Sequence, residues 1–537
     1  MKRLIASFLL FPALALCAEG LRLDAPESVG RFDVAEFSFF FYTPPAGNPF
    51  TDATVEGDFV SPAGVQRRVI GFADSQDGRV FRLRFSPDQT GSYQYHLRLQ
   101  AKGVSREWHG RLKSVASQRP GPVIVDPVSR KHFLHQGSRE PFYHVGFTAY
   151  HLVDPSNDDA QVDATIDYCA RLGFNKVRFL LAGYPRDTDT RTSTDNEHGV
   201  PDPWKRKNYG AIPGRVNALP AWIGEPHNYD FTRFNTAHWQ RIDRAVQRMR
   251  ERGIVATAIV TIEKQDLPKE YGRLTEHEYR LYRYAVARLG AFENVWWDLG
   301  NEHNEYRDAE WGNTMGAFVK SVDAHRRLVS AHAYADFWYS DSDWADFIIT
   351  QQYGDEQAVN EWALKHLSVP KPYVNEEYGY EGNDDSKFHH GLNADMTRRA
   401  HWSIAMAGGY GTYGDWSEGV SYFYMGVPGP GVGAGQLGHL RRFFEALPFR
   451  RMRPANELTS AGFGLVAPSE HYVFYLPRGG QAEVDLSGYR SAAVAGWWVN
   501  PRTGEWRSAG SLVRGKNFVS APDGGDWVLY AGVGGRR

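Results

Sequence analysis

The sequence predicts an α/β protein: a (β/α)8 barrel flanked by an N-terminal and a C-terminal all-β sandwich. In the central region, short apolar runs alternate with amphipathic helical patterns eight times, which is the count of a (β/α)8 barrel. In both flanking regions, apolar and polar residues alternate with a period of two between turn signals. A doubly wound open sheet is the alternative for the centre, but no phosphate-binding glycine loop follows any expected strand.

Length and composition agree with several domains. A chain of 537 residues is too long for one ordinary domain, and 42% hydrophobic residues are enough for a substantial core. The formal net charge of -2 argues against nucleic acid or an anionic membrane as the main partner, because both need a basic surface. Aromatic residues make up 14% of the chain, which suits either β-rich cores or stacking platforms for sugar rings.

The N-terminus has the pattern of a secretory signal. A basic start precedes the apolar run 4–16, which is too short to span a membrane, and we expect cleavage after Ala18. Cys17 raises a lipoprotein anchor as an alternative, which Leu16 disfavours because such sites need a small residue there. After cleavage Cys169 is the only cysteine, so the mature chain has no intramolecular disulfide. We therefore expect a secreted or periplasmic protein.

Alternating patterns define the two sandwiches. Residues 22–113 are expected to form the first one, with clear alternation at 81–85 and 93–99. Residues 451–537 are expected to form the second, with strands at 472–476, 494–499 and 527–530.

The barrel is expected over residues 120–447. Its eight strands are predicted at residues 142–147, 175–181, 254–262, 294–299, 328–334, 347–353, 373–377 and 405–413. Amphipathic helices lie between them, and on the first of these helices Cys169 is expected to be a core residue. The long insertion 182–233 after the second strand contains Trp204 and Trp222, and we interpret it as a lid or substrate wall.

Two of the expected strands end in carboxylates. Asn301 and Glu302 follow the fourth strand, and Glu376 and Glu377 end the seventh. Strands four and seven lie nearly opposite each other in an eight-stranded ring, and active sites of such barrels lie at the carboxyl ends of the strands. Two carboxylates about 5–5.5 Å apart would act as a retaining glycosidase pair.

The two glutamates would then have different roles. Glu302 would be the general acid and base, with a pKa raised by the nearby second carboxylate, and Glu377 would be the ionised nucleophile. Because adjacent strand residues face opposite ways, only one of Glu376 and Glu377 can point into the mouth, and we favour Glu377.

Other polar residues are weaker candidates. Arg178 on strand two, and His332 and Tyr334 on strand five, could line the pocket and contact substrate. No metal site stands out, because His277-Glu278 lacks the second histidine of the zinc helix motif, and no cofactor is expected. No Gly-x-Ser-x-Gly elbow indicates a serine hydrolase.

These motifs resemble those of the large clan of retaining glycoside hydrolases on (β/α)8 barrels. Asn301-Glu302 closing strand four, with Glu377-Tyr-Gly closing strand seven, carries that resemblance. It implies that Asn301 holds the sugar 2-hydroxyl, that Tyr353 after strand six contacts the nucleophile, and that Trp416 after strand eight forms the floor of the sugar subsite.

The whole chain more narrowly resembles an apiosidase-like barrel family, through residues 142–147 and 377–381. Residues 48–50 and 81–87 resemble the DUF5060-type sandwich that often precedes such barrels, and residues 497–504 resemble a collagen-binding-type domain. Some apiosidase-like members carry Asp where Glu302 stands. The resemblance therefore implies the reaction class, and leaves open whether apiose is the sugar.

Together these observations predict a secreted retaining glycoside hydrolase that cleaves O-glycosidic bonds of a poly- or oligosaccharide. A non-catalytic carbohydrate- or collagen-binding surface protein is the alternative, which the two flanking sandwiches suggest. The sugar, the linkage, endo or exo action and the oligomeric state do not follow from the sequence.

Overall fold

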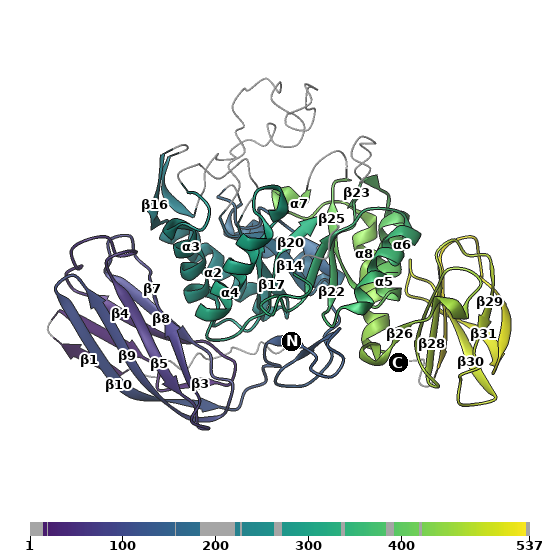
Figure 1. Cartoon of the computed structure of the whole chain (residues 1–537), viewed down its shortest axis with the longest axis horizontal. Helices are drawn as coiled ribbons and strands as arrows, with labels where there is room; N and C mark the ends of the chain where they lie inside the picture. The colour runs from purple at the N-terminus through teal and green to yellow at the C-terminus, as the bar shows by residue number, and fades with distance from the viewer. Residues whose placement is uncertain are drawn as a thin grey trace, which may run out of the picture.

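The computed structural model describes residues 14–18, 20–155, 157–182, 221–225, 228–261, 271–334, 339–382, 391–417 and 422–532. Figure 1 shows three parts in a row: an all-β unit, a central ring of strands covered by helices, and a second all-β unit. The predicted fold class is confirmed. No helix in the described parts of the chain has the length and apolar character needed to cross a membrane.

The N-terminal unit is a sandwich of two sheets. One sheet has the order β1 (Leu14–Ala18), β2 (Leu21–Ala25), β4 (Ala35–Phe41), β8 (Val80–Phe85), β7 (Phe72–Ala73). The other has the order β3 (Ser28–Gly30), β10 (Val104–Val115), β9 (Gly91–Ala101), β5 (Thr54–Val60), β6 (Gln66–Ile70). Phe37 and Leu83 of the first sheet and Phe59 and Leu97 of the second are fully buried, so alternate residues of both sheets form one core. Of the expected signal peptide, residues 1–13 lie outside the described residues.

The central unit is a ring of parallel strands. Its order is β19 (Val329–Ser330), β18 (Val295–Gly300), β17 (Val255–Thr261), β14 (Lys176–Leu180), β13 (Gly146–Thr148), β25 (Tyr410–Asp415), β22 (Tyr373–Glu377), β21 (Ile348–Gln351), β20 (His332–Tyr334). The strands at the two ends of this order, β19 and β20, follow each other in the chain and are separated only by Ala331. Strand five is therefore split into β19 and β20, and the eight predicted strands form a nearly closed barrel.

Two predicted strand starts were wrong by several residues. The first strand begins at Gly146 and not at residue 142, because residues 142–145 pack as non-strand chain below the ring. The eighth begins at Tyr410 and not at residue 405, because helix α6 continues to Met406.

Helices cover the outside of the barrel. They are α1 (Asp159–Leu172), α2 (Thr236–Glu251), α3 (Glu276–Leu289), α4 (Ala309–Val322), α5 (Glu356–Lys365), α6 (Ala394–Met406) and α8 (Val432–Glu445), with a short α7 (Tyr422–Met425). Asp158 and Gly173 begin and end α1, where Gly173 has a φ of 95° that favours glycine. Cys169 is fully buried on this helix, as predicted. Between β20 and β21, the described residues 339–347 contain no helix.

Smaller elements complete the barrel. The hairpin β11 (Val123–Val125) and β12 (Phe133–His135) closes its lower end, where the Phe133 ring lies 4.9 Å from that of Trp296. The strands β23 (Tyr380–Glu381) and β24 (Gly391–Leu392) pair beside β25. The 3-10 turns are η2 (His303–Glu305), η3 (His366–Ser368), η5 (Phe449–Arg451) and η6 (Asn456–Leu458).

Most of the predicted lid, including Trp204, lies outside the described residues. Its end forms the hairpin β15 (Trp222–Glu225) and β16 (Asn228–Phe234). Trp222 is buried there, with its ring 5.1 Å from that of Phe231.

The C-terminal unit is also all-β. Its larger sheet has the order β26 (Arg453–Pro454), β27 (Phe463–Ala467), β28 (His471–Leu476), β33 (Trp527–Gly532), β30 (Ala493–Val499), β31 (Trp506–Val513). A two-stranded sheet of β29 (Gln481–Asp485) and β32 (Lys516–Ser520) pairs separately, and Val484 and Trp527 lie in the shared core.

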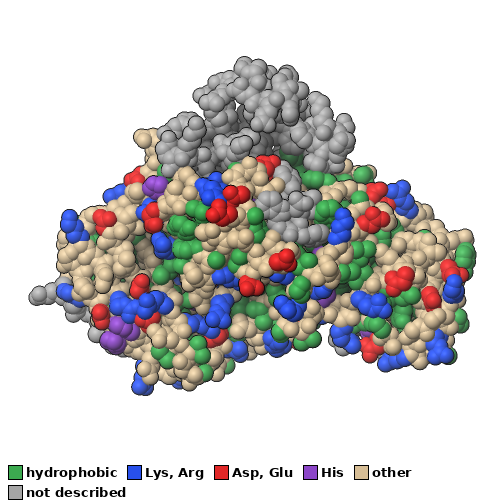
Figure 2. Space-filling model, viewed as in Figure 1, with side chains coloured by type: hydrophobic (Ala, Val, Ile, Leu, Met, Phe, Trp, Pro, Cys, Tyr) green, Lys and Arg blue, Asp and Glu red, His purple; other side chains and the backbone are tan. Residues whose placement is uncertain are grey.

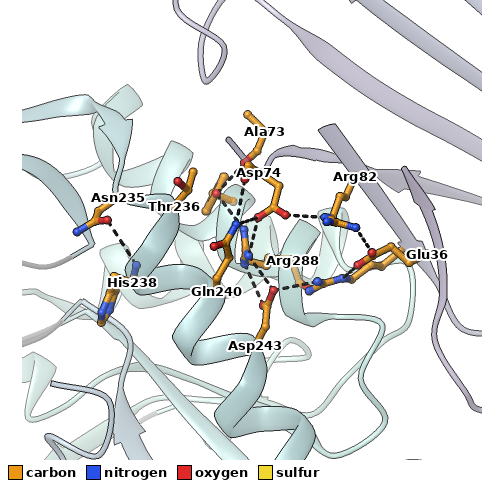
Figure 3. Close-up of polar contacts among 12 residues, drawn as sticks. Glu36, Ala73, Asp74, Arg82, Asn235, Thr236, His238, Gln240, Asp243 and Arg288 are labelled. Atoms are coloured by element: carbon orange, nitrogen blue, oxygen red, sulfur yellow. Dashed lines mark hydrogen bonds and ion pairs between the residues drawn. The ribbon is translucent and has the colours of Figure 1, made fainter. Parts of the chain in front are cut away.

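Charged side chains join the first sandwich to the barrel, as Figure 3 shows. Arg288 of α3 is fully buried and lies 2.8 Å from Asp74 of the sandwich and 2.7 Å from Asp243 of α2. In return, Arg84 of β8 lies 2.8 Å from the same Asp243. Each unit therefore supplies an arginine to a carboxylate of the other, which fixes the two units together.

Candidate active site

Glu377 ends strand β22, and its carboxylate is the centre of a buried polar cluster. Its Oε2 accepts a hydrogen bond of 3.1 Å from the Tyr353 hydroxyl and another from the Tyr380 hydroxyl. Its Oε1 accepts one from the Tyr150 hydroxyl and lies 3.4 Å from Nη1 of Arg178. Three phenols and one guanidinium thus hold the orientation of this carboxylate and stabilise its negative charge.

Arg178 connects Glu377 to the fourth and fifth strands. Its Nη2 donates to Oδ1 of Asn301 at 2.7 Å, and it also contacts Nδ1 of His332. Strands β14, β18, β20 and β22 are not all neighbours, so these contacts cross the interior of the ring. Burial alone would lower the pKa of Arg178, but Tyr150 and the surrounding carboxylates raise it well above its ordinary value. Arg178 is therefore a permanent cation under the mouth.

Glu302 lies at the same mouth. It follows Asn301, whose Oδ1 lies 2.9 Å from the Tyr150 hydroxyl. Burial is the largest cause of the raised pKa values of Tyr150 and Tyr353, and the charges of both Glu377 and Glu302 raise them further. The Tyr150 hydroxyl therefore connects Glu377 at the end of β22 to Asn301, the residue before Glu302, so the ends of these two strands meet at one site.

The backbone at Glu302 has an unusual conformation. Its φ of 46° and ψ of 38° lie in the left-handed region, which residues other than glycine rarely adopt. The turn η2 holds this conformation, with a 3.0 Å hydrogen bond from Glu305 N to the Glu302 carbonyl. Strained residues of this kind cluster at active sites, where the fold fixes a side chain in a required direction.

Glu376 occupies a different position from Glu377. It is fully buried, with Nζ of Lys176 2.7 Å from its Oε2 and the Thr412 hydroxyl donating to the same oxygen. Burial raises its pKa, but Lys176 and Arg178 outweigh burial and bring the pKa below its ordinary value. Glu376 is therefore an ionised group of the barrel interior.

The expectation that the adjacent side chains of Glu376 and Glu377 on β22 point to opposite faces of the strand was wrong. Lys176 and Arg178, two residues apart on one face of β14, contact Glu376 and Glu377 respectively. Both glutamates therefore face inward. The register explains this, because Thr350 pairs with Asn375 while the next residue, Gln351, pairs with Glu377, which leaves Glu376 as an extra residue in a bulge.

The other predicted site residues are placed as follows. His332 is fully buried below the mouth, and its ring contacts Arg178. Trp416 directly follows β25 and is buried, with its ring 6.1 Å from that of Tyr380. Tyr334 is the last residue of β20, and its side chain lies outside the described residues.

Three residues of the cluster are absent from the sequence prediction. Tyr150 lies two residues after β13, so the rule that active sites gather after strand ends could have found it. Tyr380 lies within residues 377–381, which carry the family resemblance. Asp298 lies inside β18, 3.4 Å from Arg178, and nothing in the apolar run around it indicates a polar role.

Asp298 is a buried acid with a shifted pKa. Burial raises its pKa to about 6, with Glu376 adding to the rise and Arg178 opposing it. Its Oδ1 accepts hydrogen bonds from the backbone nitrogens of Gly300 at 3.2 Å and His332 at 3.1 Å. It therefore ties the end of β18 to β20 beneath the site.

Comparison with known families matches all three parts of the chain. The family described as "Apiosidase-like, catalytic domain" matches residues 128–451. A domain of unknown function, DUF5060, matches residues 28–100. A "Putative collagen-binding domain of a collagenase" matches residues 465–531. None of the curated proteins compared with the chain matches it.

Solved structures share the fold at low identity. One from Bacteroides vulgatus, described as a "putative glycoside hydrolase", has a TM-score of 0.76 and 20% identity, over 94% of this chain and 99% of that one. A glycoside hydrolase family 5 structure from the same organism has a TM-score of 0.60 and 17% identity, over 77% and 93%. A third, described as a glycoside hydrolase, has 0.59 and 18%, over 78% and 98%.

Proposed function

This chain belongs to the apiosidase-like family of glycosidase catalytic domains, and from this premise we propose that it is a retaining glycoside hydrolase acting on a poly- or oligosaccharide. The single observation that carries the proposal is that the Tyr150 hydroxyl donates to Glu377 and lies 2.9 Å from Oδ1 of Asn301, the residue directly before Glu302. Two carboxylates sharing one site are what double displacement requires.

In the proposed mechanism the two acids work in sequence. Glu302 protonates the glycosidic oxygen while a carboxylate oxygen of Glu377 attacks the anomeric carbon, so the leaving alcohol departs and a glycosyl ester forms on Glu377. Glu302, now ionised, takes a proton from water, and that water attacks the anomeric carbon and releases Glu377. The sugar leaves with its original anomeric configuration.

The surrounding residues hold Glu377 for this attack. Arg178 and the three phenols bind its carboxylate from several sides, so little reorientation is needed when substrate arrives. We further propose that Asn301 binds the 2-hydroxyl of the sugar and that Trp416 forms the floor of its subsite. A purely binding protein has no need for such a buried, cation-paired carboxylate, which favours the enzyme over the non-catalytic alternative.

We also propose export from the cytoplasm. The apolar run at residues 4–16 after a basic start supports a signal peptide. Intact-mass measurement of the protein from a periplasmic fraction tests this proposal, because cleavage after Ala18 removes the first 18 residues.

The function is tested with a panel of plant and bacterial polysaccharides and aryl glycosides. On a substrate that the wild type cleaves, Glu377→Ala should lower kcat by about 10⁴-fold or more, and Glu302→Gln by about 10²–10⁴-fold, least with activated leaving groups. Glu305→Gln, an exposed change on the same turn, is the matched control and should retain turnover.

A 2-deoxy-2-fluoro glycoside should label the wild type covalently, on the peptide that contains Glu377. Wild-type turnover by Glu377→Ala would refute the nucleophile assignment. A product of inverted configuration in the NMR spectrum would refute the retaining mechanism.

A further inference from the structure

A cluster of potential metal ligands lies on the N-terminal sandwich, far from the sugar-cleaving site. His96 on β9 pairs directly with His109 on β10, and Glu107 lies two residues before His109 on the same face of the sheet. The ligand atoms of these three side chains all lie within 4.8 Å of one another. Nε2 of His96 already lies 2.9 Å from a carboxylate oxygen of Glu107.

We propose that His96, Glu107 and His109 form a binding site for a divalent transition metal, of which zinc suits the donors best. Two imidazole nitrogens and one carboxylate oxygen are a common zinc ligand set, which leaves the fourth tetrahedral position to water. No sequence motif indicates the site, because its ligands come from two strands and are brought together only by the register of the hairpin.

The geometry needs a small adjustment to hold an ion. Tetrahedral zinc with bonds of about 2.0–2.1 Å places its ligand atoms about 3.3 Å apart. The imidazole rings of His96 and His109 are stacked, with centroids 4.1 Å apart and planes 10° apart, so at least one ring must rotate to aim a nitrogen at a shared ion. His109 and Glu107 are exposed and His96 is partly exposed, so this rotation meets little packing resistance.

The charge around the cluster decides whether a cation is tolerated. One cation is in direct contact with the cluster: Nη1 of Arg98 lies 3.1 Å from Nδ1 of His96. Arg98 is itself neutralised by Asp58 at 2.7 Å and Glu56 at 3.4 Å. Binding of metal to Nε2 of His96 moves the ring proton to Nδ1, which breaks the contact with Arg98. Arg98 therefore competes with the metal, and Arg98→Gln should bind zinc at least as tightly as the wild type.

The cluster lies on the sheet of the sandwich that faces away from the barrel, so we infer that the metal has no role in catalysis. The barrel helix α3 contacts β7 and β8 of the first sheet, whereas β9 and β10 belong to the second. Figure 2 shows histidines beside basic and acidic side chains on the surface of the N-terminal sandwich. An ion there would join β9 to β10 and stabilise the sandwich by mass action, since it binds only the folded hairpin.

The test uses the full chain without a histidine tag, stripped of metal with a chelator and titrated with zinc chloride by calorimetry. We expect one equivalent of zinc to bind, with an affinity that falls by at least about tenfold in His109→Ala and in His96→Gln. Zinc should raise the thermal midpoint of the wild type and not that of His109→Ala. His277→Ala, which removes a histidine on α3, is the control and should bind zinc as the wild type does.

Cobalt gives a second readout that does not depend on stability. Cobalt bound at these ligands should show the visible absorption bands of a tetrahedral site, and these bands should be lost in His96→Gln. Absence of zinc binding by the wild type, or equal affinity in the wild type and both histidine variants, would overturn the proposal. Hydrolysis rates should be equal with and without zinc, and a zinc-dependent rate would contradict the non-catalytic role.

Discussion

Nζ of Lys176 lies 2.7 Å from Oε2 of Glu376, and both side chains are fully buried inside the barrel. Their strands, β14 and β22, are separated by β13 and β25, so the ion pair spans the interior. It lies one layer below the contact of Arg178 with Glu377. In the proposed mechanism the two consecutive glutamates should therefore have separable tasks, Glu376 in stability and Glu377 in chemistry.

Replacing each glutamate should separate these tasks. Glu376→Gln leaves Lys176 buried without its counter-charge, and removing one partner of a buried pair costs about 3–5 kcal/mol. Burial already lowers the pKa of Lys176 against the opposing effect of Glu376, so Lys176 should lose its proton more readily in the variant and recover part of that cost. We expect a clearly lower thermal midpoint, with kcat of the folded protein reduced less than tenfold.

Glu377→Gln is the matched comparison, and it should lose nearly all turnover while remaining folded. Equal loss of activity in the two variants at equal stability would show that Glu376 shares the chemical role.

Tyr150 should act on the rate more than on binding. Its hydroxyl donates to Glu377 and lies 2.9 Å from Oδ1 of Asn301, so Tyr150→Phe removes a donor to a charged group worth about 1.5–3 kcal/mol. We expect kcat to fall by about 10–100-fold with little change in KM, measured by steady-state kinetics. Tyr279→Phe on the outer helix α3 is the control. A rise in KM at constant kcat would instead make Tyr150 a substrate-binding residue.

Asp298 should make stability depend on pH. Its pKa is raised from an ordinary 3.8 to about 6, so the folded state holds a proton that the unfolded chain has already released between these values. The free energy of unfolding due to this group is therefore highest below pH 4 and falls by about 3 kcal/mol as pH rises to 6. Relative to Asp298→Asn, which does not titrate, the thermal midpoint of the wild type should fall over this range. A constant difference between the two proteins would contradict the shifted pKa.

Arg288 should be essential to the contact between sandwich and barrel. Arg288→Met leaves Asp74 and Asp243 without a cation that they now share at 2.8 and 2.7 Å, and we expect a loss of about 3–5 kcal/mol. Differential scanning calorimetry should show a lower midpoint or two separate transitions. Arg283→Met, on the same helix with an exposed partner, Glu276, should change the midpoint by little. A wild-type midpoint for Arg288→Met would show that the other contacts across the boundary, among them Arg84 with Asp243, hold the two units together without Arg288.

Much of the barrel could be predicted because its signals are local. A buried parallel strand is a continuous apolar run and an amphipathic helix has its own period, so eight strands emerged with only their ends misplaced. The break at Ala331 could not be foreseen, because it depends on how the ring closes between β18 and β21.

The site was harder to predict, since its residues meet only in three dimensions. Glu302 and Glu377 could be proposed because acids at strand ends stand out against apolar runs. Asp298 and the bulge at Glu376 could not, because a buried polar residue inside a strand has no signal until its partner across the ring is known. The cluster of His96 and His109 was missed for the same reason: register, and not spacing, brings the two rings together.

The charged seam between the first sandwich and the barrel also limits how such proteins can exchange their accessory modules. A replacement module would have to present an acid where Asp74 stands and a guanidinium where Arg84 stands, because Arg288 and Asp243, which pair with each other, would otherwise lose their partners in the sandwich. A purely apolar interface would tolerate many modules of similar shape, whereas this interface also requires complementary charges on the incoming module. Recombination at this boundary should therefore succeed only between relatives that carry the same four charged residues, at the positions of Asp74, Arg84, Asp243 and Arg288.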